Sequence, residues 1–417
     1  MSNTLTTNEV TTTRAAKVIA RCRELARITD VPGETTRLYL SPATRNAHTL
    51  LSWWMRQAAL HSLTDDIGNL RAIRFASVPN APTLVLFSHI DTVPNAGAFD
   101  GPLGIIAAIG IIEALGSTPL PFNIELIAFA EEEGVRYSTP FLPSYAATGH
   151  FDPDVLERKD ANGITFAQAI RNFGLDPDRI PISCPLDADT FAALEIHIEQ
   201  GPVLDAANES LAVVDTIVGQ SRLTVVFEGR ANHAGTTPMP LRHDALAAAA
   251  QWIVEVERFA AEHKQLVATV GRIEVHPGAA NVVPGSARLT LDLRHPKDES
   301  RHAAVATLLT KAERAADLRG VRVHASASAE QKAVPMDRTL TLELQQAAAR
   351  AGYDARTMFS GAGHDAMILA PHIPTTMLFL RSPNGQSHHP DETVREEDVE
   401  AAIATVLDFI KHLQPPT

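Results

Sequence analysis

A strand, a helix and a second strand follow one another between residues 83 and 130, and each of the three segments is almost wholly apolar. The runs at 83–87 and 124–130 are short and lack polar alternation, which is typical of strands buried in a parallel sheet. The apolar segment at 103–115 has the length of a helix. This order predicts a βαβ unit with a right-handed crossover, and hence an α/β fold with a mostly parallel central sheet.

The length of the chain implies more than one hydrophobic core. At 417 residues it exceeds the size at which single cores stop growing, so we expect two domains. Residues 216–329 follow the order strand, helix, strand, strand, helix, strand, which is typical of a ferredoxin-like α+β domain. Residues 1–215 and 330–417 have the α/β pattern. The sequence therefore predicts an α/β domain that carries an inserted α+β domain.

Composition argues against several functions. Charged residues make up 20% of the chain and the net charge is −13, which disfavours a nucleic-acid partner. No apolar run is long enough to span a membrane, and the N-terminal residues lack the apolar core of a signal peptide. Cys22 and Cys184 are far apart and have no metal-ligand spacing, so we expect neither a disulfide framework nor thiolate ligation. A cytoplasmic enzyme is the expectation.

Histidines and carboxylates follow the predicted strands at the points where the strands end. His89 and Asp91 come after the run at 83–87, Asp100 lies nine residues further on, and the triplet Glu-Glu-Glu at 131–133 follows the next strand. Ligands of open α/β sheets bind at the carboxyl ends of the strands, and imidazole and carboxylate both bind divalent cations. Three adjacent carboxylates repel one another unless cations share the space, although a solvated acidic turn explains the triplet alone.

Two further predicted strand ends carry the same residue types. His197 lies in the segment 194–198, on one face with Glu195 and Glu199, and His388 and His389 lie in a loop after the strand at 375–380. A single loop histidine is usually a surface residue, but four such clusters at four strand ends predict a metal site. Spacing alone does not decide which glutamate of the triplet acts, or which of the two adjacent histidines binds.

Seven ordered blocks of the chain resemble a group of metal-dependent amidohydrolases. This group contains allantoate amidohydrolase, N-carbamoyl-L-amino-acid hydrolase and β-ureidopropionase, and it is a branch of the aminoacylase and carboxypeptidase clan. The blocks are SHIDTVPNAGAFDGPLG (88–104), EEEGVRY (131–137), EIHIEQGPVL (195–204), GRANHAGTTPMPLRHDAL (229–246), NVVPGSARLTLDLRH (281–295), SGAGHDAM (360–367) and QSHHPDE (386–392). The resemblance runs from about residue 35 to the C-terminus. It implies that the inserted domain is a lid and dimerisation domain and that the protein is a homodimer.

The resemblance also implies a centre of two divalent metal ions, Zn²⁺ or Mn²⁺, with Co²⁺ or Ni²⁺ as alternatives. Its ligands would be His89, Asp100, Glu133, His197 and His388. Asp100 would bridge the two ions, because two cations about 4 Å apart need a shared carboxylate. Glu132 would be the general base that activates the water, and Asp91 would orient His89.

Other residues are implied to hold the substrate: Gln200, His233, Asn281, Arg294 and His364. Arg294 would grip the substrate carboxylate, which is a bidentate task suited to a guanidinium group. His364 would stabilise the oxyanion, with Asp365 orienting it. His233 would polarise the scissile carbonyl or hold the substrate, in its own subunit or in that of the partner. Without the resemblance, His233 is typical of a structural loop histidine and Arg294 of a surface arginine.

The activity that the resemblance implies is hydrolysis of a ureido or carbamoyl C–N bond in a small carboxylate. We favour allantoate as the substrate, because residues 36–43, TRLYLSPA, resemble the N-terminal block of allantoate amidohydrolases. N-carbamoyl-L-amino acids and β-ureidopropionate are the close alternatives.

Two more distant alternatives fit the sequence less well. An aminoacylase or dipeptidase usually carries aspartate in the position of His197, and a non-catalytic binding protein would be expected to have lost ligands or the base. The chain departs from the usual family pattern at Ala96, Ala98, Val135 and His389, and none of these departures removes a ligand.

Overall fold

The computed structural model describes residues 13–415, and the chain divides into two compact units. The first unit comprises the residues up to 215, residues 336–358 and the residues from 364 on, and the second comprises residues 216–335 and 359–363. The second unit extends beyond the predicted insertion, 216–329. It does so because its last long strand continues past residue 329 and because the N–H of Val218 donates to the carbonyl of Ser360 at 3.0 Å.

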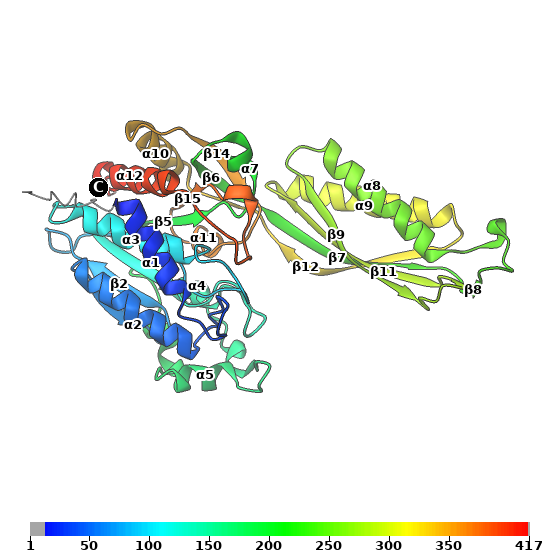
Figure 1. Ribbon diagram of the computed structural model, residues 1–417, viewed down its shortest axis with the longest axis horizontal. Helices are drawn as coiled ribbons and strands as arrows, with labels where there is room; N and C mark the ends of the chain where they lie inside the picture. Colours follow the sequence, from blue (N-terminus) through cyan, green and yellow to red (C-terminus); the bar gives the residue numbers. More distant parts are fainter. Residues whose placement is uncertain (1–12, 416–417) are drawn as a thin grey trace, which may run out of the picture. The chain divides into compact units, whose positions relative to one another are not determined.

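The first unit is built on a mixed sheet whose central strands are parallel (Figure 1). The strand order is β1-β2-β4-β3-β5-β15-β6-β13, and β14 pairs with β6. Pairing is parallel among β4, β3, β5 and β15 and antiparallel on both flanks, at β1, β2 and β6. The strands are β1 (His61–Thr64), β2 (Leu70–Arg74), β3 (Thr83–His89), β4 (Asn123–Phe129), β5 (Thr190–Ile198), β6 (Leu211–Ile217), β13 (Val334–Pro335), β14 (Ala355–Ser360) and β15 (Thr375–Leu380). The α/β fold class is confirmed, with a parallel centre and antiparallel flanks.

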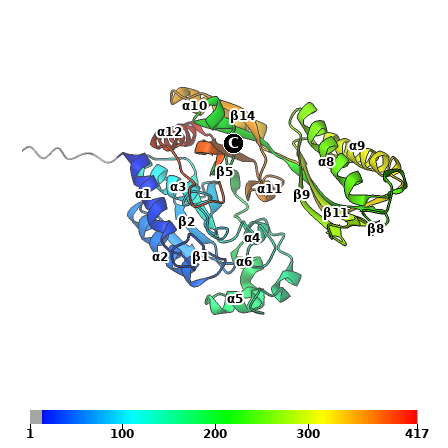
Figure 2. The same cartoon turned by 45° about the vertical axis from the view of Figure 1, so that its right-hand side comes forward.

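Helices cover the sheet and explain why its central strands are apolar throughout. One group of five helices packs together, with α1, α2 and α12 against α3 and α10 against α12. Figure 2 shows α1 and α2 beside α3. The members of this group are α1 (Arg14–Ala26), α2 (Pro42–Gln57), α3 (Pro102–Leu115), α10 (Arg338–Arg350) and α12 (Glu396–His412). Most residues of α3 are buried, as expected for a helix that is apolar on all sides. A second, separate hydrophobic cluster includes residues of α4 (Leu142–Ala147) and α5 (Phe166–Asn172).

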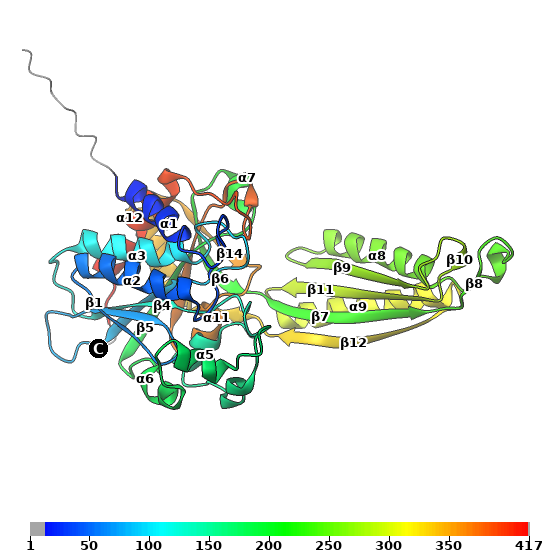
Figure 3. The same cartoon turned by 60° about the horizontal axis from the view of Figure 1, so that its bottom comes forward.

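The second unit has the predicted ferredoxin-like order of elements. Its four-stranded antiparallel sheet has the order β12-β7-β11-β9, and α8 and α9 pack against it (Figure 3). Alternate residues of β7, such as Leu223, Val225 and Phe227, are buried with Trp252 of α8, which is the pattern of a sheet with one covered face. The elements are β7 (Gly219–Glu228), α8 (Ala245–Glu262), β9 (Val267–His276), β11 (Ser286–His295), α9 (Asp298–Asp317) and β12 (Arg322–Gln331).

The remaining α-helices and strands are short. They are α6 (Ile180–Ser183), α7 (Val203–Ala207), β8 (Asn232–His233), β10 (Val282–Val283) and α11 (Ala366–Leu369). Cys22 and Cys184 are both buried and unpaired. Within residues 13–415, no helix combines the length and the apolarity needed to cross a membrane. Most of the N-terminal stretch, for which no signal peptide is predicted, lies outside the described residues.

Candidate metal centre

The polar clusters predicted from the sequence come together because their strands are parallel neighbours. In the order β4-β3-β5-β15, the strands β3 and β5 carry His89 and His197 at or near their last residues. The glutamate triplet begins two residues after the end of β4, and the loop after β15 leads to His388. Since parallel strands end at the same edge of a sheet, these side chains meet there.

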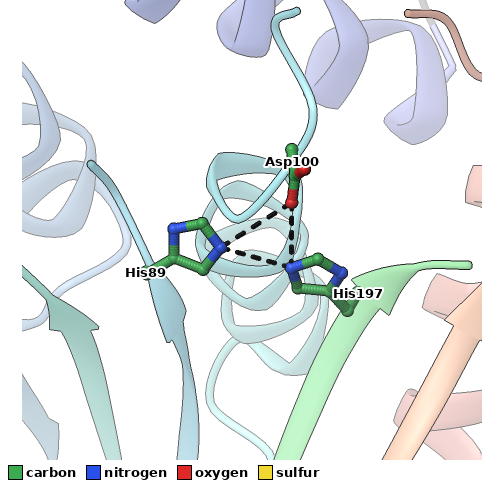
Figure 4. A group of neighbouring side chains, drawn as sticks. All are labelled: His89, Asp100 and His197. Atoms are coloured by element: carbon green, nitrogen blue, oxygen red, sulfur yellow. Dashed lines mark hydrogen bonds and ion pairs between the residues drawn. The ribbon is translucent and has the colours of Figure 1, made fainter. Parts of the chain in front are cut away.

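His89, Asp100 and His197 form a first buried triad (Figure 4). The Nε2 atoms of the two histidines are 3.3 Å apart, and both face Asp100 Oδ1, at 3.7 Å from His89 and 3.2 Å from His197. Asp100 Oδ1 is buried and has no hydrogen-bond partner among the described residues. Two imidazole nitrogens and an unsatisfied carboxylate oxygen that converge on one point fit a cation, which would satisfy all three.

The other ring nitrogens of the two histidines have acceptors nearby. Nδ1 of His197 lies 2.9 Å from the carbonyl oxygen of Ile198, and Nδ1 of His89 lies 3.3 Å from both Asp91 Oδ1 and the Asp91 carbonyl. An imidazole that donates from Nδ1 presents an unprotonated Nε2, which is the form that ligates a metal. Asp91 also accepts hydrogen bonds from the backbone N–H groups of Glu132 and Glu133, at 2.9 and 3.1 Å. Asp91 thus ties the end of β3 to the glutamate triplet.

Asp100 also belongs to a second triad, with Glu133 and His388. His388 Nε2 lies 3.2 Å from Asp100 Oδ2 and 3.4 Å from Glu133 Oε1. These two carboxylates raise the pKa of His388 to about 10, which shows how strongly this point attracts positive charge. Burial alone would raise the pKa of Asp100, but the three imidazoles around it hold that pKa well below the usual value. Asp100 therefore presents one oxygen to each triad, as a carboxylate that bridges two cations would.

The structure distinguishes the three glutamates of the triplet. Glu132 and Glu133 lie together with His89, whereas Glu131 belongs to none of the candidate groups among the described residues. Burial raises the pKa of Glu132 well above the usual value, opposed by His89 and reinforced by Glu133. A buried carboxyl beside the cluster, with a raised pKa, is suited to accept and release a proton. The positions of the side chains thus set Glu131 apart from Glu132 and Glu133, which the spacing of the three residues in the sequence could not do.

His364 and Asp365 lie beside the first triad. The ring of His364 packs edge-on against that of His197 with centroids 4.5 Å apart, and burial lowers the pKa of His364 well below 6.5. The Ser144 hydroxyl donates to Asp365, and the N–H of Ala366 donates to Glu195 at 2.9 Å. A neutral imidazole in this place is able to donate one hydrogen bond. The anchors Ser144 and Glu195 had no assigned role in the sequence, although Glu195 shares a strand face with His197.

Two residues of the site have left-handed backbones, which non-glycine residues rarely adopt. Gln200 has φ 58° and His388 has φ 56°. Such conformations cost energy and concentrate at functional sites. The side-chain amide of Gln200 donates to Asp100 Oδ2 at 2.9 Å, so the structure places this predicted substrate residue on the carboxylate between the two triads. His389 is exposed, accepts from the N–H of Asp391 at 3.2 Å, and belongs to none of the candidate metal groups of residues 13–415.

The second unit carries the other predicted substrate residues, and it carries them far apart. His233 of β8 is exposed and pairs with Val282, next to Asn281. Arg294 lies at the other end of β11, where it pairs with Gln220. Eight residues of antiparallel strand separate Ser286 from Arg294, which is roughly 27 Å. A small carboxylate is too short to touch Arg294 and the pair His233 and Asn281 of the same chain.

Arg294 is already partly engaged. Its Nε and Nη2 donate to the two oxygens of Asp292 at 2.9 and 3.1 Å, and its Nη1 donates to the carbonyl of Gly361 at 2.7 Å. Burial would raise the pKa of Asp292, but Arg294 and Arg222 hold it below the usual value. A guanidinium group has five N–H donors, so donors remain on Arg294 for a carboxylate once these three bonds are made.

Gly101 permits the close approach of the Asp100 loop to His89. Its φ is +80°, and a Cβ at this position would overlap the imidazole ring of His89. We therefore expect Gly101→Ala to displace that ring and weaken metal binding by roughly 10- to 100-fold, as loss of ligand orientation does elsewhere. Titration calorimetry with Zn²⁺ measures the effect. The matched control is Gly116→Ala at the other end of α3, where φ is +53° and nothing lies within 4 Å. Equal weakening in both variants would show that backbone strain alone is responsible.

Comparison with known proteins places the chain in a family. Residues 85–412 match the model of peptidase family M20/M25/M40, and the chain therefore belongs to this family. An N-carbamoyl-L-amino acid amidohydrolase from Geobacillus stearothermophilus is 37% identical over 381 residues, which cover 91% of this chain and 93% of that protein. Allantoate deiminase 2 from Glycine max is 35% identical over 430 residues, which cover 95% of this chain and 89% of that protein.

Solved structures agree with this assignment. The crystal structure of an amidase of the hydantoinase/carbamoylase family from Burkholderia multivorans has a TM-score of 0.89 and 32% identity, and covers 95% of this chain and 97% of that chain. The relationship to amidohydrolases that the seven sequence blocks indicate is thus confirmed. The roles of the individual site residues stay predictions.

Proposed function

We propose that this protein hydrolyses a ureido or carbamoyl C–N bond in a small carboxylate, with allantoate as the leading substrate, at a centre that holds two divalent metal ions. The observation that carries the proposal is the position of Asp100, which shares one carboxylate between two triads, with Glu132 beside them. The names of the relatives, N-carbamoyl-L-amino acid amidohydrolase and allantoate deiminase, support the same bond type.

The proposed ligands are His89 and His197 on one ion, Glu133 and His388 on the other, and Asp100 on both. Nitrogen and carboxylate donors suit Zn²⁺, Mn²⁺, Co²⁺ and Ni²⁺. When bound, such ions lower the pKa of a coordinated water and polarise the substrate carbonyl. All five ligands belong to the first unit.

The protein's own groups carry the remaining steps of the proposed reaction. Glu132 accepts the proton of the attacking water and then delivers it to the nitrogen that leaves. Neutral His364 donates a hydrogen bond to the oxyanion that forms at the attacked carbon. Arg294 holds the substrate carboxylate with the donors that Asp292 and Gly361 leave unused.

The choice of allantoate rests on residues 36–43, and these residues have a structural role. Arg37 is buried, and its guanidinium donates to the carbonyls of Ile90 and Leu25 at 2.6 and 3.1 Å. This block therefore supports the loop between His89 and Asp91. The substrate is decided by assaying the Zn²⁺- or Mn²⁺-loaded protein on allantoate, N-carbamoyl-L-amino acids and β-ureidopropionate while following ammonia. Turnover of carbamoyl amino acids without turnover of allantoate would overturn the choice of allantoate.

The separation of His233 and Asn281 from Arg294 supports a homodimer in which each chain completes the other's site. Two inactive variants, His233→Ala and Glu132→Gln, test this arrangement when they are mixed and allowed to exchange subunits. We expect the mixture to regain activity, because a mixed dimer of twofold symmetry contains one site with an intact Glu132 and an intact His233 from the partner. Size-exclusion chromatography with light scattering checks that dimers form. A mixture that stays inactive despite exchange would mean that His233 acts within its own chain.

A further inference from the structure

Glu392 connects the loop that carries His388 to the loop that carries Asp100. Its side chain is only 5% exposed, and Oε1 accepts hydrogen bonds from the backbone N–H groups of Phe99 and Asp100, at 2.8 and 3.0 Å. These donors lie more than 290 positions earlier in the chain. Gly97 leaves the space that the Glu392 side chain fills, because a Cβ at position 97 would overlap Glu392. The fold therefore brings this carboxylate against the backbone of the predicted bridging ligand.

Ser387 makes the second connection between the same two loops. Its hydroxyl donates to Asp100 Oδ2 at 2.6 Å, and its oxygen lies 3.2 Å from Glu392 Oε2. Asp100 is thus held twice from the His388 loop, at its backbone by Glu392 and at its side chain by Ser387. Glu392 belongs to none of the candidate metal groups found within residues 13–415, so its contacts position a ligand rather than supply one.

We propose that Glu392 is a positioning residue that sets the distance between Asp100 and His388, and thereby builds the ion site made by Asp100, Glu133 and His388. Oδ1 of Asp100 faces the first triad and Oδ2 faces His388, so a small shift of the Asp100 loop changes the second site directly. His89 and His197, by contrast, are fixed by their own strands. The proposal rests on the two-ion centre proposed above.

Three variants of Glu392 separate reach from charge. Glu392→Ala removes the contact. Glu392→Asp keeps the charge but is one methylene too short to reach the two amides, and Glu392→Gln keeps the length and an oxygen that accepts both N–H bonds. Asp391→Ala, which removes an exposed carboxylate from the same loop, is the matched control.

The readout is the binding of Co²⁺ to metal-free protein, followed by calorimetry and by visible absorption, together with kcat and KM. We expect Glu392→Ala and Glu392→Asp to weaken the ion held by Asp100, Glu133 and His388 by roughly 10- to 100-fold, because supporting residues of metal ligands act on this scale. The ion held by His89, His197 and Asp100 should weaken less, because its two histidines lie on strands that Glu392 does not contact. We expect kcat to fall as the occupancy of the weakened ion site falls, while KM changes little. Glu392→Gln and Asp391→Ala should resemble the wild type.

Two results would overturn the proposal. One is wild-type affinity for both ions in Glu392→Ala. The other is tighter binding of Co²⁺ by Glu392→Asp than by Glu392→Gln. If Glu392→Ala does not fold, the pair Glu392→Asp and Glu392→Gln carries the test, because only Glu392→Gln keeps the reach to the N–H groups of Phe99 and Asp100. Weaker binding of the ion at Asp100, Glu133 and His388 in Glu392→Asp than in Glu392→Gln supports the proposal, and equal binding in the two variants contradicts it. Failure of the wild type to bind two ions would instead contradict the two-ion centre itself.

Discussion

Glu132→Gln is expected to lower kcat by about 100- to 10,000-fold, which is the range that a positioned general base contributes. The amide has nearly the same shape as the carboxyl, but it cannot accept the proton of the attacking water. The backbone N–H of Glu132 donates to Asp91, and this bond does not depend on the side chain, so the ligands should stay in place. Elemental analysis is expected to find the same metal content as in the wild type.

Glu131→Gln is the matched control for this variant. Glu131 is the neighbouring residue, it is also buried, and it lies outside the candidate metal groups of the described residues. We expect this control to keep most of its activity. A fully active, metal-loaded Glu132→Gln protein would refute the assignment of the base, and a collapse of activity in Glu131→Gln alone would transfer that role to Glu131.

Asp100→Asn is expected to abolish the binding of both ions and to reduce activity below detection. Asp100 is the one residue common to the two triads, and its two oxygens face His197 and His388 separately, at 3.2 Å each. An amide keeps the shape but has lost the negative charge and one of the two oxygens, so it cannot bridge two cations. It also leaves three buried or half-buried imidazoles without their counter-charge.

Chelation and reloading measure this effect. The wild type is stripped with a chelator and then reloaded with Zn²⁺ or Mn²⁺, which we expect to restore its metal content and activity. Asp100→Asn should recover neither. The exposed Asp391→Asn, treated in the same way, controls for loss of a carboxylate in this region. Retention of two ions by Asp100→Asn would contradict the bridging role.

The elements that could be predicted from the sequence are those whose environment leaves a plain pattern. β3 and α3 are buried on all sides, and their uninterrupted apolar runs therefore reveal them. β1 was not predicted, because it is a short flank strand with mostly exposed residues and no alternation of apolar and polar side chains. The order of strands and helices in the second unit could be predicted because its sheet has one covered and one open face, which produces alternation along β7 and β11.

The candidate site was predictable only in part, because many of its contacts join residues that are far apart in the sequence. His89 and His197 are found in sequence because they stand at the ends of apolar runs. Glu392 was missed, since its partners are backbone N–H groups on a distant loop, and no side-chain pattern records them. For the same reason the pairing of Arg294 with Asp292 and Gly361 emerges only from the three-dimensional structure.

The division of the chain into two units separates the proposed metal ligands from three of the predicted substrate residues. All five proposed metal ligands and the proposed base lie in the first unit, whereas His233, Asn281 and Arg294 lie in the second. With the roles proposed above, substitutions confined to the second unit would alter contacts to the substrate without moving a metal ligand, so metal binding and substrate choice would be free to change independently of one another.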